Sequence, residues 1–544
     1  MKKPLIAILL FSAFFVNGQS IDSLYNHFLR VKGIKQFGLP NQVSDAGEPI
    51  KCGFGTINNV RMNYDKFSAT QKKVVAALLG RPASDTSVVT KSGKIRIHFF
   101  KSGVNAPVYD INELVKAADS VYNYEVNILG FPPPPGDFGL GGDDLYDIYI
   151  ENLGYGNYGY TDGDQKLTDS TYACYSAIDN DFEQGFNTHG INAAKVTLAH
   201  EFHHAIQMGN YIYRPNDLWY MELTSTSMEE FVFDSVNDYY FYLPTYFRYP
   251  HKSLGNLTID MGYSRVIWNL YLKERFGVGI IKQIWDLIPK ERALKAFADV
   301  IVKYGSDFKT EFNQFGTWMY YTNFRAVPNK YFKEAASYPL IKYLMSTQFT
   351  PPSTLLTVSS EPVSNNFLVF RDNSTTPGDT LVSILSNCNI DGAISSPIKY
   401  LDFNYTVSTQ KISDRNILNK YYTKYESSNN FILIESNILD NIPIEGFSTA
   451  ELDYPFPQPF RYSVNPEISF PTKINGTGKA ELYIYSAGMK LVFSGAMQIR
   501  ASDKIYISWN AIDNQNKKLS SGVYIYFVKS GDVINKGKFV IYND

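Results

Sequence analysis

The sequence predicts an α+β chain, in which a mixed region of helices and strands is followed by two domains built from strands. Three observations predict this class. Apolar residues recur at helical spacing from about residue 191 to residue 324. Short β-branched and aromatic runs, separated by Asn, Ser and Gly turns, follow residue 340. A Pro-rich stretch, 453–471, then introduces a last group of strands.

Length and composition limit the classes of protein that this chain can belong to. It has 544 residues, and that length suggests roughly three or four domains. The chain is 44% hydrophobic and 15% aromatic, which is enough for packed cores, and richness in Tyr is common in secreted β-proteins. A net charge of -2 gives no sign of a nucleic-acid or anionic-membrane partner.

The first twenty residues, "MKKPLIAILLFSAFFVNGQS", have the pattern of an export signal. Two lysines precede an apolar run that is shorter than the ~20 residues of a membrane span. We therefore expect residues 1–18 to be a removed signal peptide. No later segment is long and apolar enough to span a membrane, so we expect a secreted or cell-surface protein.

Residues 19–88 form a mixed leader that is either retained or removed as a propeptide. Its segment "SATQKKVVAALLG" predicts a short helix with Ser68 as cap and Gly80 as stop. The chain has three cysteines, which is too few for a disulfide scaffold. We expect one disulfide, between Cys52 and Cys174, and a remaining thiol at Cys388.

Residues 89–340 alternate strands and helices. Strands are expected at 93–100, 145–153 and 171–179, and helical spacing covers 113–130. The prolines of 131–144 predict a loop. This loop and the following strand offer oxygen ligands that could suit a structural Ca²⁺, but their spacing fits no EF-hand, so an ordinary loop is favoured; they come from Asp137, Asp143, Asp144 and Asp147.

The stretch "VTLAHEFHHAIQ" places three of the seven histidines within five positions. It contains the pattern H-E-x-x-H at His200, Glu201 and His204. Two imidazoles four residues apart lie on one face of a helix and can both bind Zn²⁺, while the glutamate can act on a water molecule bound there. The segment 191–209 has helical spacing, with Gly209 as its stop.

A catalytic zinc site needs a third ligand, and the segment "NDLWYMELTSTSMEEF" offers glutamates for it. Glu222 and Glu229 are seven residues apart on one expected helix and share a face, and Glu230 follows. His203 lies about 100° around the helix from His204, so we expect a second-shell or surface role. His98 and His189 are interpreted in the same way, with His98 satisfying a local hydrogen bond in its strand.

These motifs resemble the gluzincin metallopeptidases, in which a Trp-x-x-Glu helix follows the H-E-x-x-H helix. The pattern here is Trp219-x-x-Glu222. Residues 50–330 are similar to a family of secreted bacterial proteins described as zinc metallopeptidases, through "IKCG", "LGFPPPPGD", "TLAHEFHHAIQ" and "GYSRVIWNLYLKERFG". The resemblance implies a zincin-like fold for residues 89–340, with His200, His204 and Glu222 as zinc ligands and Glu201 as general base.

The same resemblance suggests two further roles. Gluzincins place a Tyr or His beyond the third ligand to stabilise the oxyanion, and Tyr263 is the candidate here. The spacing from His204 to Glu222 is one residue shorter than in aminopeptidase-type gluzincins, which keeps Glu229 open as the third ligand. We also consider the hypothesis that the Cys52 thiolate caps the zinc of a latent enzyme.

Two β-domains are expected after the helical region, at 341–450 as a β-sandwich and at 451–544 as an Ig-like module. The last one resembles the carboxy-terminal sorting domain of type IX secretion cargo in Bacteroidetes, which implies the secretion machinery as a partner. Its pattern reads as a Trp-anchored strand, an Asn/Asp turn and a Gly before an edge strand. The residues that carry it are Trp509, Asn510, Asp513, Leu519, Gly522 and Tyr524.

The sequence therefore predicts an exported zinc endopeptidase that acts on proteins or peptides. The alternative is a non-catalytic surface or adhesion protein that keeps the same scaffold and binds proteins or glycans. An aminopeptidase is less favoured, because we find no acidic motif that would anchor a substrate amine.

Overall fold

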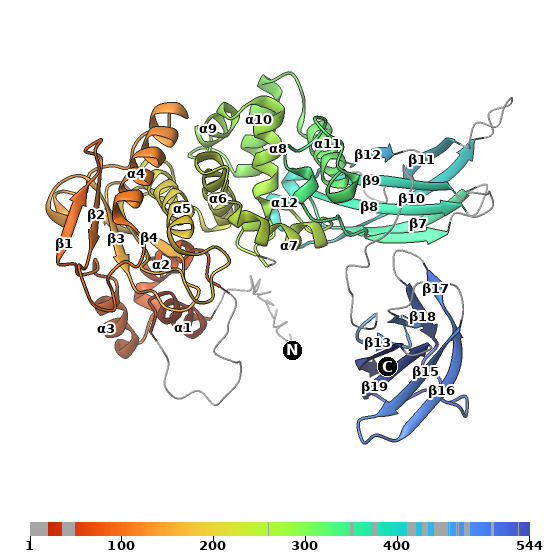
Figure 1. Ribbon diagram of the computed structural model, residues 1–544. Helices are drawn as coiled ribbons and strands as arrows, with labels where there is room; N and C mark the ends of the chain where they lie inside the picture. Colours follow the sequence, from red (N-terminus) through yellow and green to blue (C-terminus); the bar gives the residue numbers. More distant parts are fainter. Residues whose placement is uncertain are drawn as a thin grey trace, which may run out of the picture.

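The computed structural model shows a mixed N-terminal region, a helical middle and two regions of strands (Figure 1). It describes residues 20–34, 49–258, 260–348, 353–372, 379–410, 420–426, 434–439, 455, 457–463, 465, 467–472, 479–501, 505–530 and 533–543. The expected signal peptide, residues 1–18, lies outside these residues. In the part of the chain that is described, no helix has the length and apolar character needed to cross a membrane.

A five-stranded sheet organises the first part of the chain. Its order is β1-β2-β3-β5-β4, with β2, β3 and β5 parallel and both edge strands antiparallel to their neighbours. The strands are β1 (Thr86–Val89), β2 (Ile95–Phe99), β3 (Tyr146–Glu151), β4 (Gly159–Lys166) and β5 (Tyr172–Asp179). The expected strands at 93–100, 145–153 and 171–179 are confirmed, whereas the sequence prediction missed β1 and β4.

Helices cover both faces of this sheet, as the alternation of strand side chains requires. On one face, Ile148 and Ile178 pack in the largest core, which also holds side chains of α4 (Ile111–Tyr122) and α5 (Gly190–Asn210). On the other face, Tyr149 and Tyr175 pack against the leader helices. These are α1 (Ile21–Val31), α2 (Phe54–Met62) and α3 (Ala69–Leu78).

The leader is thus built onto the sheet, and the expected boundary after residue 88 falls inside β1. Helix α3 begins as predicted, because Ser68 and Gln71 form a reciprocal capping box. The predicted helix 113–130 is α4 followed by a π-helical turn at Asn123–Ile128.

Helix α5 carries the H-E-x-x-H motif and confirms the predicted helix at 191–209. It ends at Asn210 rather than by a left-handed Gly209. The absence of a side chain at Gly209 has another reason, since a Cβ there would lie 2.2 Å from Cδ of Pro135. The proline loop 131–144 therefore packs directly on the end of α5.

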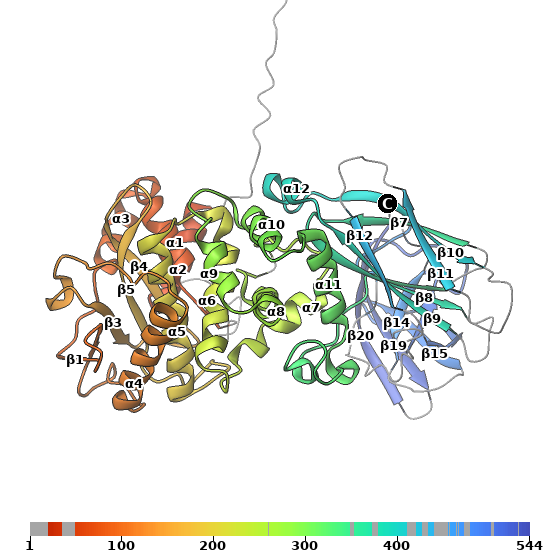
Figure 2. The same cartoon turned by 90° about the horizontal axis from the view of Figure 1, so that it is seen from above.

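The helical middle begins with α6 (Leu218–Val232), which packs alongside α5 and carries the Trp-x-x-Glu pattern. Figure 2 shows α5 and α6 side by side between the sheet and the later helices. Those helices are α7 (Leu243–Arg248), α8 (Val266–Phe276), α9 (Gly279–Trp285), α10 (Ala293–Lys303) and α11 (Phe308–Tyr320). They confirm the expectation of several helices up to Phe324.

A two-sheet arrangement follows and confirms the expected strands after residue 340. One sheet has the order β11-β10-β7 and the other β12-β9-β8-β6. Leu368 and Leu385 pack in the small core with β7 and β10, while Phe367 and Ile384 on the opposite face join the large core of the helical middle. The elements are β6 (Met345–Gln348), β7 (Ser353–Ser360), β8 (Ser364–Asp372), β9 (Asp379–Asn387), α12 (Ile390–Ser395), β10 (Leu401–Gln410), β11 (Lys420–Glu426) and β12 (Ile434–Leu439).

The last module has a hydrophobic core of its own. Its sheets have the orders β13-β20-β19-β15-β16 and β14-β18-β17. The strands are β13 (Phe460–Arg461), β14 (Ile468–Pro471), β15 (Lys479–Ser486), β16 (Leu491–Gln498), β17 (Arg500–Ala501), β18 (Ile505–Trp509), β19 (Gly522–Ser530) and β20 (Val533–Tyr542).

The sorting-type pattern maps onto this module with one correction. Trp509 ends β18, packs near Phe470 and Phe493, and donates its Nε1–H to the Ile512 carbonyl. Asp513 then accepts backbone hydrogen bonds in the following turn. The expectation that Gly522 precedes an edge strand is wrong, because β19 is paired on both sides, with β15 and β20.

Candidate metal centre

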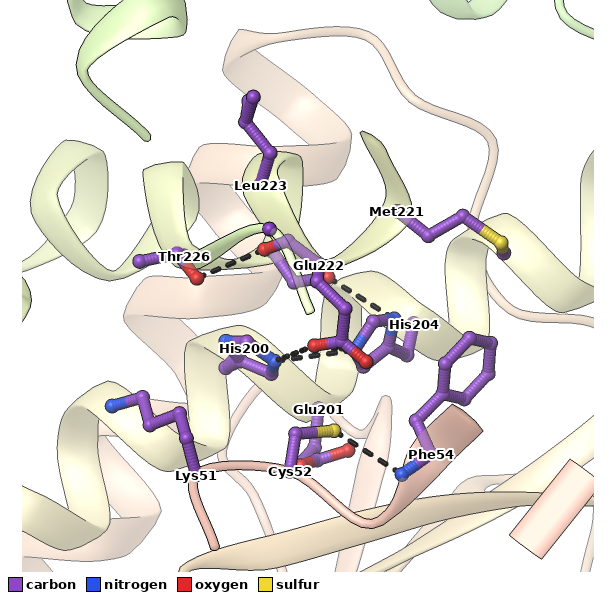
Figure 3. A network of polar contacts seen from close by, with 12 residues as sticks. Lys51, Cys52, Phe54, His200, Glu201, His204, Met221, Glu222, Leu223 and Thr226 are labelled. Carbon is purple, nitrogen blue, oxygen red and sulfur yellow. Dashed lines mark hydrogen bonds and ion pairs between the residues drawn. The ribbon is translucent and has the colours of Figure 1, made fainter. Parts of the chain in front are cut away.

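Helices α5 and α6 bring three candidate ligands together in the interior. Nε2 of His200 lies 3.1 Å from Nε2 of His204, and Oε2 of Glu222 lies 3.2 Å and 3.4 Å from these two atoms. All three side chains are at most 1% exposed. Figure 3 shows the Glu222 carboxylate meeting the two imidazoles that α5 presents.

The other ring nitrogen of each histidine is held by an acceptor. Nδ1 of His200 lies 2.7 Å from Oε1 of Glu229, and Nδ1 of His204 lies 2.8 Å from Oε1 of Gln207. The Gln207 amide is oriented by its Nε2, which donates to the Met221 carbonyl. With Nδ1–H donated to these acceptors, each Nε2 can present a lone pair to the centre when the ring is neutral.

This arrangement separates the roles of the two glutamates that the sequence left open. Glu222 faces the Nε2 atoms, where a ligand must lie, whereas Glu229 binds the outer nitrogen of His200. Glu229 also accepts a hydrogen bond from Lys51 at 2.8 Å. By geometry, Glu222 is the better candidate for a third ligand, and Glu229 holds Nδ1 of His200.

Two imidazole nitrogens and a carboxylate oxygen this close together favour a positive charge between them, either a proton or a metal ion. Burial would lower the pKa of His200, but Glu222 and Glu229 outweigh it and raise that pKa to about 9. Burial would raise the pKa of Glu222, yet the two imidazoles lower it to about 2. In both cases the surroundings favour the charged form of the group.

Zinc fits this donor set. Two imidazole nitrogens and a carboxylate oxygen are common ligands of catalytic zinc, at distances of about 2.0–2.2 Å. Ligand atoms in a tetrahedron of that size lie about 3.3–3.6 Å apart. The separations of 3.1, 3.2 and 3.4 Å are close to that range.

Glu201 is the neighbour of the first ligand and is fully buried. Oγ1 of Thr161 in β4 lies 2.7 Å from Oε2 of Glu201 and 2.9 Å from its carbonyl oxygen. Burial raises the pKa of the Glu201 carboxyl group, and His200, His204 and Thr161 oppose that effect. A raised pKa suits a group that must take up and release a proton.

Tyr263 lies beside the centre, in the 3₁₀ turn η6 (Tyr263–Arg265) that follows Gly262. Its ring centroid is 6.2 Å from that of His200. Burial raises the pKa of the Tyr263 hydroxyl, and the charge of Glu222 adds to the effect. The hydroxyl is thus a neutral donor near the ligands, where the resemblance places an oxyanion-stabilising group.

Cys52 joins the same group from the leader segment. Its sulfur, an atom from each of the two imidazoles and a Glu222 oxygen all lie within 4.8 Å of one another. The expected Cys52–Cys174 disulfide is therefore wrong, and both cysteines are free thiols. Cys52 faces the histidines, whereas Cys174 lies in β5 and its Sγ donates to the Tyr172 carbonyl.

The remaining histidines do not enter the centre. His203 is buried, and its Nδ1 lies 2.8 Å from Oε2 of Glu125 in the π-helical turn. His98 lies 2.7 Å from Oδ1 of Asp147, as the strand prediction implied, and Nδ1 of His189 contacts the Phe182 carbonyl. His203 is thus a packing residue and not a surface one.

The acidic residues of the 131–147 stretch are engaged by neighbours of the leader and the sheet. Asp137 and Asp147 pair with Arg81, at 2.5 Å and 2.6 Å. Asp143 pairs with Arg96, and Asp144 accepts a hydrogen bond from the Gly139 amide. These contacts favour the ordinary-loop interpretation, and the structural Ca²⁺ stays an untested expectation.

Sequence reasoning gave no role to Thr161, Gln207 or Lys51. Gln207 could have been found, since it lies three residues after His204 on the same helix. Thr161 lies in the missed strand β4, so nothing in the motif indicates it. Lys51 precedes Cys52, and its partners come from α6 and from Asp238, far away in the sequence.

Comparisons with known proteins do not test the resemblance to metallopeptidases. A family model described as "Family of unknown function (DUF6055)" matches residues 101–328, which include α5 and α6. The comparison with curated proteins gives no match.

Among solved structures, the chain is similar to PorZ, described as an essential bacterial surface component of the type-IX secretion system of Porphyromonas gingivalis. Identity is 14%, and the match covers 30% of this chain and 29% of that one. The TM-score is 0.13, so this likeness carries no argument about fold or function.

Proposed function

We propose that this protein is an exported zinc-dependent peptidase with its centre between α5 and α6. The observation that carries the proposal is the convergence of two Nε2 atoms and one carboxylate oxygen within 3.1–3.4 Å, in the interior. His200, His204 and Glu222 would hold the metal. The zincin-like fold and the gluzincin type belong to this proposal.

When bound at these residues, zinc supplies a Lewis acid for peptide hydrolysis. Glu201, whose carboxylate accepts a hydrogen bond from Thr161, would take a proton from the attacking water and pass it to the leaving amine. Tyr263 would donate a hydrogen bond to the developing oxyanion. Burial of the whole group excludes bulk water and strengthens each of these interactions.

Metal content tests the proposal, with Glu222→Ala and Glu229→Gln as a matched pair on one helix. The reconstituted full chain should hold one zinc ion. Glu222→Ala should lose it, while Glu229→Gln should keep it with an affinity lowered by about 10–100-fold, as for other outer partners of ligating histidines. No zinc in the wild-type chain after reconstitution would refute the proposal.

Hydrolysis of an unfolded protein such as casein tests the catalytic part. It is measured on the wild-type chain and on Cys52→Ser, because the Cys52 thiol lies beside the centre. Glu201→Gln should retain zinc and lose about 10²–10⁴-fold of the rate, the usual contribution of a general base. Equal rates with and without Glu201 would contradict the assignment.

We further propose that the last module addresses the protein to the type IX secretion machinery, and that the protein acts outside the cell or on its surface. The support is the sorting-type pattern and the separate core of the module. Removal of residues 451–544 should stop release of the protein from a type IX-secreting bacterium. Unchanged release of the shortened chain would refute this part.

One observation favours the non-catalytic alternative, a surface protein with a structural metal. Four protein ligands are typical of structural zinc sites, and Cys52 offers a fourth. In that case Cys52→Ser would bind metal but hydrolyse nothing.

A further inference from the structure

We propose that Cys52 is a fourth ligand of the metal centre and occupies the position that the attacking water would need. The inference rests on the proposed zinc site and adds a ligand from the leader segment to it. With Cys52 bound, the centre is closed, and the chain is in a resting state.

The first support is the placement of the sulfur. Sγ of Cys52 belongs to the group of four donor atoms that lie within 4.8 Å of one another, and all four residues are buried. With zinc–sulfur bonds of about 2.3 Å and zinc–nitrogen bonds of about 2.0–2.1 Å, a tetrahedral site needs the sulfur about 3.6 Å from each nitrogen. Figure 3 shows Cys52 on the side of the imidazoles away from the α6 backbone that carries Glu222.

The second support is that the neighbours of Cys52 also contact the ligands or their partners. Lys51 binds Glu229, the residue that holds His200. The Phe54 ring stacks on the His204 ring, with centroids 3.9 Å apart and planes 7° apart. The Phe54 amide donates to Sγ of Cys52 at 3.3 Å and so orients the sulfur.

The third support is the proximity of Cys52 to the proposed general base. The side chains of Cys52 and Glu201 lie next to each other (Figure 3), and Oε1 of the buried Glu201 has no hydrogen-bond partner among the described residues. The step balances with one proton: the S–H bond breaks, Glu201 takes the proton, and the sulfur lone pair forms the bond to the metal. No oxidant is needed, and a water molecule replacing the thiolate would reverse the step.

A consequence follows from coordination number. Catalytic zinc keeps one position open for water, and a site with four protein ligands has none. The segment around Cys52 would thus act on the centre as an internal inhibitor. Displacing the sulfur, and not adding a cofactor, is what would start hydrolysis.

Cobalt substitution tests the inference without relying on activity. The zinc-free full chain is loaded with Co²⁺ as wild type, Cys52→Ser, Cys52→Ala and the control Cys174→Ala, whose thiol is also buried. We expect one bound Co²⁺ in all four. A thiolate-to-cobalt charge-transfer band in the near ultraviolet should appear in wild type and Cys174→Ala, and be lost in both Cys52 variants.

The outcomes separate this inference from the proposed function. Cobalt bound with the same spectrum in wild type and the Cys52 variants would overturn the inference and leave the metal site standing. No cobalt bound in wild type would overturn the metal site itself. Circular dichroism checks that each variant is folded. Two substitutions of Cys52 are used so that a folding defect of one variant does not decide the result.

Casein hydrolysis is the last part of the test. If Cys52 occupies the water position, Cys52→Ser should hydrolyse casein faster than wild type, and adding Glu201→Gln should abolish that gain. A Cys52-dependent band without any gain in hydrolysis would support the ligand and contradict the peptidase assignment.

Discussion

At the scale of single residues, Lys51 links the leader to the candidate centre. Its ammonium group is buried between Glu229 and Asp238, at 2.8 Å and 2.5 Å, and lies 4.5 Å from the Tyr158 ring centroid. Burial would lower the pKa of Lys51, but the two carboxylates outweigh it and raise that pKa. The lysine is therefore charged and compensates two buried anions.

Lys51→Met should destabilise the protein, because it leaves both carboxylates buried without their cation. Breaking a buried ion pair costs about 3–5 kcal/mol. Chemical denaturation should report the loss, and a zinc competition assay should show weaker binding, since Glu229 would no longer be held. Lys195→Met is the control, because its pair with Glu113 is partly exposed and worth about 0–1 kcal/mol. Equal effects of both substitutions would contradict the assigned role.

Glu230 predicts a pH dependence of stability. Burial, and then the charges of Glu334 and Asp234, raise its pKa to about 9, with Lys273 acting in the opposite direction. A glutamate in an unfolded chain ionises near pH 4.3. Between these values the folded chain holds a proton that the unfolded chain has lost, so the free energy of unfolding falls as pH rises.

Glu230→Gln cannot ionise and should flatten this dependence. At pH 8 the variant should unfold at a higher denaturant concentration than wild type, and near pH 4 the two should converge. Denaturant titrations at several pH values measure the effect, with the exposed Glu183→Gln as a control for net charge. A wild-type midpoint that is constant from pH 5 to pH 9 would refute the prediction.

At the scale of elements, Gly262 sets how close η6 lies to α6. Its φ is 125°, and a Cβ there would lie 2.1 Å from the Trp219 carbonyl oxygen. Gly262→Ala must therefore push Tyr263 away from the centre. We expect this clash to add to the roughly 1–2 kcal/mol that a side chain costs at a positive φ and to lower the thermal midpoint by several degrees, together with slower hydrolysis in the Cys52→Ser background.

The control for Gly262 is Gly277→Ala. This glycine also has a positive φ, 86°, but a Cβ there meets no atom within 4 Å. It should cost only about 1–2 kcal/mol of backbone strain and leave hydrolysis unchanged. If both variants behave alike, the contact with Trp219 has no role in placing Tyr263.

Elements were predictable where one physical signal dominated. Helix α5 has both a regular apolar pattern and a motif that requires a helix, and the Ser68 cap defined the start of α3. Strand β4 was missed because its sequence "GYTDGDQK" is rich in Gly and Asp. Its polar side chains are used by distant partners, Thr161 by Glu201 and Asp162 by Arg61.

The residues of the candidate site also differ in how well the sequence predicts them. His200, Glu201 and His204 follow from local spacing, and Glu222 from a second local pattern. The choice between Glu222 and Glu229 depends on the packing of α6 on α5, which spacing alone does not fix. The disulfide prediction failed for the same reason, because the fold sends Cys52 to the histidines and Cys174 to β5.

At the scale of the whole molecule, the β-sandwich and the helical middle share one core. Strands β8 and β9 direct alternate side chains to opposite sides, so that Phe367 and Ile384 pack with the helices while Leu368 and Leu385 pack with β7 and β10. Asn313 of α11 also donates to the Ile384 carbonyl, at 3.2 Å. The boundary expected at residue 340 therefore runs through a shared hydrophobic core, and we expect the segments on either side to fold together.

Truncation tests this coupling. A chain ending at residue 340 loses all side chains that β8 and β9 add to the large core. Four of them are fully buried and apolar, each worth about 1.5–3 kcal/mol; they are Phe367, Val369, Val382 and Ile384. Their sum, about 6–12 kcal/mol, is comparable to the whole stability of a typical domain. We expect that chain to be unfolded or insoluble and to hold no zinc.

A chain ending at residue 450 is the matched control, because the module that it lacks has a separate core. It should keep the thermal midpoint and the zinc content of the full chain, since both depend on the core that joins α5, α6, α11 and β8. The comparison is made by calorimetry and metal analysis on chains that start at the same residue. A stable, zinc-binding chain ending at residue 340 would show that the helical middle folds without the strands that follow it. Those strands would then form a separate domain that packs against α11 without being needed for its stability.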